Sequence, residues 1–286
     1  MKNLEALSDT PAYIDRYISI RNAKRNPARS KLTQFHHVIA ERYEALAKLL
    51  VSKSLESLTS DTRTAQLSEC LRSCYDSPTD HLRELKQAIR DAQPKRLLKY
   101  CPMCGTTLPR TFDHYLPASE FPEFSVHPLN LVPCCATCNS IKTADWLTSS
   151  GTRQYLHMYF DELPDVPFIS VVLHEDSVLK GVGATFSIAR PTGISDKLWL
   201  LVESHFVRLN LIERYDERGN DEIAEILSNC RVFLEAGGKD CPAFLRGLAK
   251  ERRTVYGRSH WVAVLMDEMA SHRNLPNWVN LTDGLS

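Results

Sequence analysis

Residues 112–142 read FDHYLPASEFPEFSVHPLNLVPCCATCNSIK. An aspartate and a histidine stand side by side near the start, two asparagines follow later, and cysteines gather toward the end. A folded core has little use for so many polar and metal-binding groups in one short stretch. The combination therefore predicts that these residues share a chemical task.

The cysteines fall into two pairs, each with the spacing Cys-x-x-Cys. Cys101 and Cys104 form the first pair, Cys135 and Cys138 form the second, and 30 residues separate the pairs. Each pair can turn two thiolates toward one point, and tetrahedral Zn²⁺ takes four such ligands at about 2.3 Å. Gly105 suits the tight turn after the first pair. We predict a structural zinc site that closes residues 101–138 into a loop and, having no open coordination position, is not catalytic.

Cys134 complicates the choice of ligands because it stands next to Cys135. It could replace Cys135, although the longer Cys-x-x-x-Cys spacing fits such a turn less well, and the alternative stays open at this point. An odd total of nine cysteines, five of them within 101–138, does not suit a secreted disulfide framework. Core packing is the interpretation for the remaining four, Cys70, Cys74, Cys230 and Cys241.

The order of these motifs resembles that of the HNH nucleases, which have the ββα-metal fold. The resemblance covers about residues 101–145. Its elements follow in order: the first cysteine pair, Asp113-His114, Asn130 within Asn-Leu-Val-Pro, the second cysteine pair, and Asn139 followed by Lys142. The third letter of the motif is asparagine here rather than histidine.

The resemblance implies a metal-assisted hydrolysis of phosphodiester bonds. Asp113 and the side-chain oxygen of Asn139 would bind Mg²⁺ or Mn²⁺, since hard cations prefer oxygen ligands. His114 would be the general base, because a neutral imidazole accepts a proton near pH 7. On a strand, His114 and Asp113 point to opposite faces, so the pair needs a twist or a strand end to serve one site.

Three further residues receive supporting roles from the same resemblance. Asn130 would fix the loop or orient His114. Lys142 lies one turn beyond Asn139 on a helix expected at 136–147, where it would contact a nucleic-acid phosphate, and Arg110 would do likewise. Within the loop, Glu123 and His127 are expected to face solvent, and the alternative for either is an extra metal ligand or a substrate contact. Phe121 and Phe124 are expected to pack and close the loop.

The flanking regions predict an α+β protein with a central ββα-metal core. Residues 1–94 are expected to be a helical N-terminal region, 95–148 the zinc-containing nuclease domain, and 149–286 a hairpin followed by helices. A helix is predicted within 78–94, with Thr79 or Asp80 as its N-cap and Pro94 as its stop. The other expected elements are a helix near 34–58, two alternating strands within 166–190 joined by an irregular turn near 175–181, and helices near 195–210, 212–236, 243–256 and 259–273.

Charge and hydropathy narrow the class of protein. The chain has 286 residues, with 35 basic and 35 acidic side chains, which excludes a polybasic nucleic-acid binder but not a local basic patch. Residues 1–94 carry 15 basic against 12 acidic side chains. A basic segment at 21–31 is either a solvated loop or a phosphate contact. No signal peptide or membrane-spanning run is apparent, so a cytoplasmic protein without membrane contact is the expectation.

The sequence thus predicts a metal-dependent HNH endonuclease. More loosely, it resembles the HNH subunits of Septu-type and retron-associated anti-phage systems, which implies an ATPase partner. Two alternatives remain: a zinc-stabilised nucleic-acid-binding or structural subunit without cleavage activity, and a stand-alone restriction-like endonuclease. The sequence does not choose between DNA and RNA, nor between a homo-oligomer and a hetero-oligomer.

Overall fold

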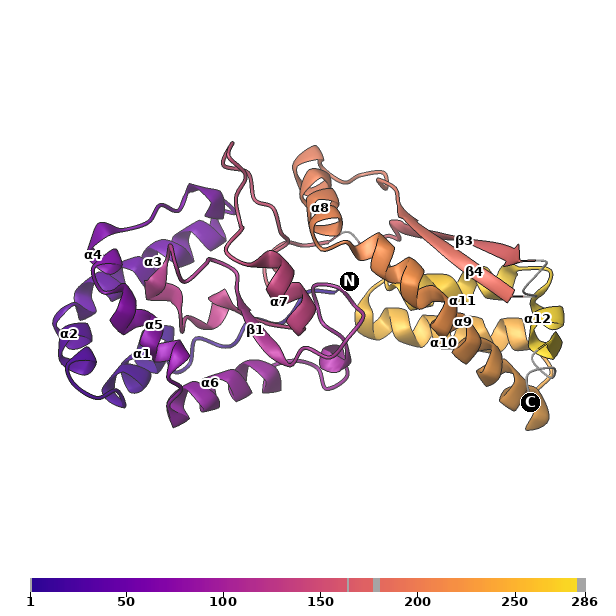
Figure 1. The fold of residues 1–286 in the computed structure, drawn as a ribbon, viewed down its shortest axis with the longest axis horizontal. Coiled ribbons are helices and arrows are strands. Elements are labelled where there is room, and N and C mark those ends of the chain that lie inside the picture. Colours follow the sequence, from indigo (N-terminus) through magenta and orange to yellow (C-terminus); the bar gives the residue numbers. More distant parts are fainter. Residues whose placement is uncertain (1, 164, 177–180, 282–286) are drawn as a thin grey trace. The chain divides into compact units, whose positions relative to one another are not determined.

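The computed structural model describes residues 2–163, 165–176 and 181–281. The chain divides into two compact units, one of Asn3–Glu162 and the other of Leu163–Ser286 with Met1–Lys2. Both units mix helix and strand, with helix predominating and a small two-stranded sheet in each (Figure 1). The predicted regions 1–94 and 95–148 therefore lie in one unit, and the division falls after residue 162 rather than after 148.

The first unit begins with helices that pack through apolar faces. They are α1 (Tyr13–Asn22), α2 (Ala28–Gln34), α3 (His36–Val51), α4 (Thr62–Ala65), α5 (Ser68–Asp76) and α6 (Asp80–Asp91). In α6, Leu82, Leu85 and Ile89 are buried at helical spacing. The Thr79 side chain accepts a hydrogen bond from the Leu82 amide, so the predicted N-cap is confirmed as Thr79.

A short hairpin and a helix follow. Strand β1 (Thr111–His114) pairs antiparallel with β2 (Leu131–Cys134), and Asp113 lies opposite Val132. Helix α7 (Ala136–Lys142) starts directly after β2. It ends five residues before the predicted end at 147, where Thr143 adopts a left-handed φ of 49°.

The loop between β1 and β2 is buried among the N-terminal helices, which corrects the expectation that Glu123 and His127 face solvent. Both side chains are buried, as is Phe124. Arg42 of α3 forms a 2.7 Å ion pair with Glu123, and the Tyr43 ring of α3 packs edge-on against His127 at 4.4 Å. Burying a carboxylate requires such a partner. These contacts join the helical region and the hairpin into one unit.

The second unit is built on the hairpin of β3 (Ile169–Asp176) and β4 (Gly181–Ile188), as predicted. The predicted turn between the strands includes residues 177–180, which lie outside the described residues. The helices are α8 (Asp196–Arg208), α9 (Leu211–Glu235), α10 (Cys241–Tyr256), α11 (Trp261–Ser271) and α12 (Leu275–Leu281). Helix α9 packs on β4 so closely that a Cβ at Gly219 would lie 3.3 Å from both Ala184 and Phe186, which explains a glycine inside this helix.

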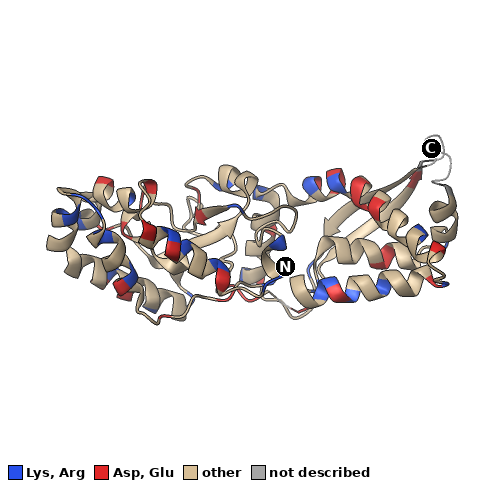
Figure 2. Ribbon diagram, turned by 90° about the horizontal axis from the view of Figure 1, so that it is seen from below, with Lys and Arg blue, Asp and Glu red and all other residues tan. Residues whose placement is uncertain are grey.

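Acidic and basic side chains are interspersed over the helices of both units (Figure 2). This distribution agrees with the balanced formal charge of the chain. Across the described residues, no helix combines the length and the apolar character that crossing a bilayer requires.

Candidate metal centre and adjoining polar site

Four buried cysteines converge at one end of the β1–β2 hairpin. The sulfur atoms of Cys101, Cys104, Cys135 and Cys138 all lie within 4.8 Å of one another. The first two come from the turn before β1, where the Gly105 amide donates to the Cys101 carbonyl at 2.7 Å and Gly105 adopts a φ of 69°. The other two come from the start of α7. This arrangement can hold a metal ion such as zinc.

Backbone amides point at these sulfurs and favour their thiolate forms. The Cys135 amide donates to the Cys101 sulfur at 3.3 Å, and the Cys138 amide donates to the Cys135 sulfur at 3.4 Å. Hydrogen bonding with Cys101 lowers the pKa of Cys104 to about 6, whereas burial raises the pKa of Cys101 itself. A cluster that gains negative charge on deprotonation suits a divalent cation.

Cys134 does not belong to this cluster. Its sulfur lies 3.3 Å from the Thr111 hydroxyl oxygen, and burial raises the pKa of Cys134 to about 12. Adjacent residues at the end of a strand point in different directions, so Cys135 alone of the two faces the other three cysteines.

Asp113 is buried against α7, where it meets Lys142. The Lys142 ammonium lies 3.1 Å from one Asp113 carboxylate oxygen and donates to the other at 3.3 Å. It also donates to the backbone carbonyls of His114 and Tyr115, at 2.9 and 3.1 Å. Burial raises the pKa of the Asp113 carboxyl, and the Lys142 charge opposes that rise.

The position of Lys142 corrects its predicted role. Its side chain is completely buried and bonded on several sides, so it does not extend to a phosphate in solution. Lys142 instead neutralises Asp113 and fixes the end of β1 against α7.

His114 follows Asp113 as the last residue of β1 and contacts the loop between the strands. Its Nε2 lies 2.8 Å from the Ser125 carbonyl oxygen, which can only accept, so Nε2 carries the proton and Nδ1 of the neutral ring is an acceptor. The Tyr75 ring of α5 packs edge-on at 4.4 Å. Burial lowers the pKa of His114, which favours the neutral ring near pH 7.

Asn130 fixes the loop that contains Ser125, whose carbonyl oxygen contacts His114. Its side-chain oxygen accepts from the Leu116 amide at 2.7 Å, and its nitrogen donates to the carbonyls of Leu116 and Phe124, at 3.0 and 3.1 Å. Phe124 directly precedes Ser125, so Asn130 holds in place the segment on which His114 is anchored. A role in fixing the loop, one of its two predicted roles, agrees with these contacts.

Asn139 and Arg110 both line a surface pocket of about 480 Å³. Asn139 is half-buried on α7, and its side-chain amide makes no hydrogen bond to another described residue. Arg110 is exposed at the start of β1, where it remains available to an anion. The other lining residues are Tyr75, Arg83, Lys86, Gln87, Arg90, Thr111 and Phe112.

The basic side chains from α6 in this pocket were not among the predicted site residues. Arg83, Lys86 and Arg90 each directly follow one of the buried residues Leu82, Leu85 and Ile89, so a helical projection of 80–91 would have shown a basic stripe beside the apolar face. It would not have shown that the stripe faces Asn139.

The donors present fit a hard cation only in part. Asp113 has carboxylate oxygens and Asn139 has an amide oxygen, the ligand types that Mg²⁺ and Mn²⁺ prefer. The Lys142 ammonium, however, already compensates the Asp113 charge. Any cation bound there would compete with it.

The chain is similar in sequence to a phage protein. It is 29% identical to Protein ea31 of Escherichia phage lambda over 137 residues, which is 47% of this chain and 46% of that protein. The match therefore spans less than half the length of that relative. No family model matches the chain, and no solved structure matches it.

Proposed function

We propose that the protein is a metal-dependent nuclease of the HNH type. The observation that carries the proposal is the fixed orientation of His114, whose Nε2–H is held by Ser125 while Asn130 anchors the same loop. A general base needs a defined tautomer with a free lone pair, and this arrangement leaves Nδ1 as the acceptor. The strand–strand–helix order around the cysteine cluster also supports the proposal.

The proposed site divides the chemistry among a few side chains. His114 accepts the proton of the attacking water, and Arg110 contacts the phosphate near the pocket. Asp113 and Asn139 would hold Mg²⁺ or Mn²⁺, which supplies charge stabilisation to the phosphate and the leaving oxygen. Asn139 lies one turn before Lys142 on α7, and Lys142 contacts Asp113, which supports this assignment.

Zinc in the cysteine cluster is a structural part of the same proposal. Four sulfurs would fill the tetrahedral coordination of zinc and leave no position for substrate. The metal would hold the start of β1 against the start of α7, and so keep Asp113 close to Asn139.

A second candidate, a nucleic-acid-binding subunit without cleavage activity, is favoured by one contact. The ion pair between Asp113 and Lys142 satisfies the carboxylate without any metal. In a binding subunit this pair would be permanent. In a nuclease, Asp113 must exchange Lys142 for the cation.

The test is cleavage of plasmid DNA, single-stranded DNA and RNA by the purified chain, with Mg²⁺, Mn²⁺ or no added metal. We expect metal-dependent cleavage that falls by roughly a hundredfold or more in His114→Ala, the range of a lost general base. The exposed His37→Ala is the matched control and should cleave normally. Equal cleavage by both variants would remove His114 from the mechanism.

The resemblance to defence systems extends the proposal to a partner ATPase that restrains or activates the nuclease. Absence of cleavage by the isolated chain, followed by cleavage with a co-purified ATPase, would support such a partner. Cleavage at full rate by the chain alone would favour the stand-alone endonuclease. Continued inactivity with the partner present would favour the binding subunit.

A further inference from the structure

The pocket beside Asn139 has four basic side chains and no acidic one in its lining. Arg83, Lys86 and Arg90 come from α6, and Arg110 comes from the segment before β1. A formal net charge of zero for the whole chain makes this local excess of positive charge unusual.

Most of this charge has no counter-ion on the protein. Among the described residues, no carboxylate pairs with Lys86, Arg90 or Arg110, and Arg83 pairs only with the exposed Asp80 at 2.7 Å. Arg90 is held in place through its bond to the Pro109 carbonyl at 2.7 Å. Burial and the neighbouring Arg90 both lower the pKa of Lys86, as expected where like charges are crowded together.

Aromatic rings hold these cations in position and connect them to His114. The Lys86 ammonium lies 3.7 Å from the centre of the Tyr75 ring, and the Arg90 guanidinium lies 4.8 Å from the centre of the Phe112 ring. The Tyr75 ring also contacts the His114 ring, with 4.4 Å between the ring centres. The Tyr75 ring therefore lies in contact with both Lys86 and His114, the proposed general base.

We propose that Arg83, Lys86 and Arg90 of α6, together with Arg110, bind the phosphodiester backbone of a nucleic-acid strand and guide it to Asn139 and His114. The inference rests on the proposed function and names the surface that holds its substrate. Positions 83 to 90 extend about 10 Å along the helix axis, enough to contact more than one phosphate. Phosphate contacts of this kind position a strand without reading its bases.

The test measures binding separately from cleavage. Labelled single-stranded DNA, duplex DNA and single-stranded RNA are titrated with the full chain carrying His114→Ala, without added Mg²⁺ or Mn²⁺, and fluorescence anisotropy is followed at several salt concentrations. The test variant adds Arg83→Gln and Lys86→Gln. The matched control adds Arg63→Gln and Lys48→Gln, two exposed positions on α4 and α3.

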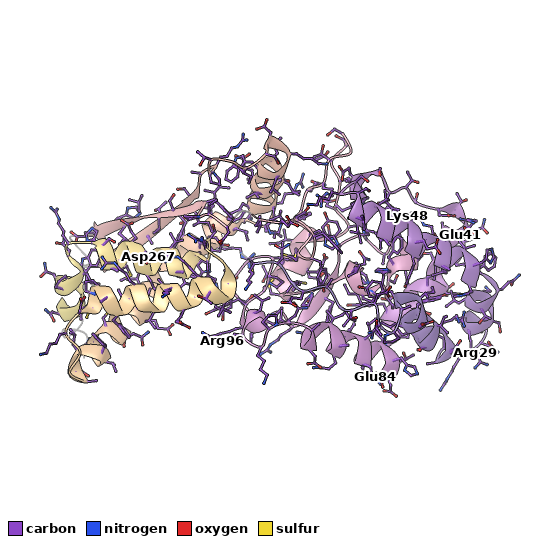
Figure 3. All side chains as sticks on the ribbon, turned by 180° about the vertical axis from the view of Figure 1, so that it is seen from behind. Arg29, Glu41, Lys48, Glu84, Arg96 and Asp267 are labelled. Carbon is purple, nitrogen blue, oxygen red and sulfur yellow. The ribbon has the colours of Figure 1, made fainter. Side chains whose placement is uncertain are left out.

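The control pair removes the same charge from another surface of the same unit. Figure 3 labels Lys48 on α3, apart from Glu84, which marks α6. Arg63, like Arg83, pairs with a nearby aspartate, so the two arginines are matched in this respect. Arg90 is left unchanged because its bond to Pro109 supports the fold. A further variant, Lys86→Arg, preserves the charge and should bind like the parent.

We expect the α6 pair, Arg83→Gln with Lys86→Gln, to weaken binding roughly tenfold or more. It should also reduce the slope of log K against log salt by about 2, since each phosphate contact contributes about one unit. The control pair should leave both quantities unchanged. Equal losses for the two pairs, no loss for the α6 pair, or no binding of any probe would each overturn the inference.

Failure of the inference remains distinguishable from failure of the proposed function. With His114 intact, the α6 pair should raise KM for cleavage while retaining kcat, because it alters the grip on the strand and not the chemistry. If the α6 pair shows metal-dependent cleavage with an unchanged KM, the proposed nuclease function is retained and the proposed role of α6 in substrate binding is wrong.

Discussion

At the scale of single residues, burial decides which titratable groups have which role. His127 and His157 are both buried, and burial lowers the pKa of each to about 3. His127 is held neutral by its environment, and its Nδ1 accepts from the Leu129 amide at 3.2 Å. His114 differs because it is only half-buried and keeps an acceptor nitrogen beside a pocket-lining tyrosine.

The pKa of His127 predicts a pH-dependent stability. The unfolded histidine takes up a proton near pH 6.5 and the folded one near pH 3, so lowering the pH through this window favours the unfolded state. Between pH 7 and pH 5 the free energy of unfolding should fall by about 2 kcal/mol through His127 alone. Urea unfolding at the two pH values measures the fall.

His127→Gln keeps an acceptor near Leu129 but does not titrate. It should reduce the difference between pH 7 and pH 5 by about 2 kcal/mol relative to the parent chain. An exposed histidine, His37, serves as the control and should leave the difference unchanged on replacement by Gln. An unaltered difference in His127→Gln would show that this side chain is not buried as described.

At the scale of elements, the cysteine cluster and the ion pair of α3 hold the hairpin from two sides. The cluster joins the turn before β1 to the start of α7. The pair between Arg42 and Glu123 joins α3 to the loop between β1 and β2. Neither β1 nor β2 is long enough to be stable as an isolated hairpin.

The zinc proposal predicts different outcomes for two neighbouring cysteines. Cys135→Ser should reduce bound zinc well below one ion per chain, because it removes one of four converging sulfurs. Cys134→Ser should retain about one zinc, because its sulfur contacts Thr111 instead. Zinc content measured by elemental analysis decides the matter, and the reverse result would exchange the roles of the two cysteines.

Breaking the buried ion pair predicts a large loss of stability. Arg42→Ala leaves the Glu123 carboxylate buried without its partner, which should cost about 3–5 kcal/mol. Arg63→Ala, which breaks the pairs of the exposed Arg63 with Glu41 and Asp61, should cost much less, because solvent screens such pairs. Chemical denaturation of both variants gives the comparison, and similar small losses would mean that water reaches Glu123.

At the scale of the whole molecule, the hairpin and the cysteine cluster share a unit with the N-terminal helices. Helices α1 to α6, the hairpin and α7 lie within Asn3–Glu162. The second unit has its own aromatic core, in which Tyr215 and Trp261 stack at 5.3 Å. Each unit thus has the buried apolar side chains that a separate folding unit needs.

This division predicts the behaviour of two fragments. A fragment of residues 3–162 should bind zinc and unfold cooperatively, because all the contacts of the hairpin are retained. A fragment of residues 95–148 should not unfold cooperatively, because it exposes Phe124 and leaves Glu123 and His127 without their partners on α3. Thermal unfolding followed by circular dichroism tests both, and cooperative unfolding of the shorter fragment would support the predicted boundary at residue 95.

The sequence by itself determined features that depend on near neighbours. The start of a helix at Thr79 or Asp80 and the two Cys-x-x-Cys turns arise from residues a few positions apart, whereas the structure decided for Thr79 as the N-cap. Only the tertiary structure decided which groups meet from distant parts of the chain. Such contacts joined Glu123 to Arg42, buried Lys142 against Asp113, and brought the basic face of α6 to Asn139. The reason is physical: local periodicity indicates that a face is apolar or charged, whereas packing alone determines what that face contacts.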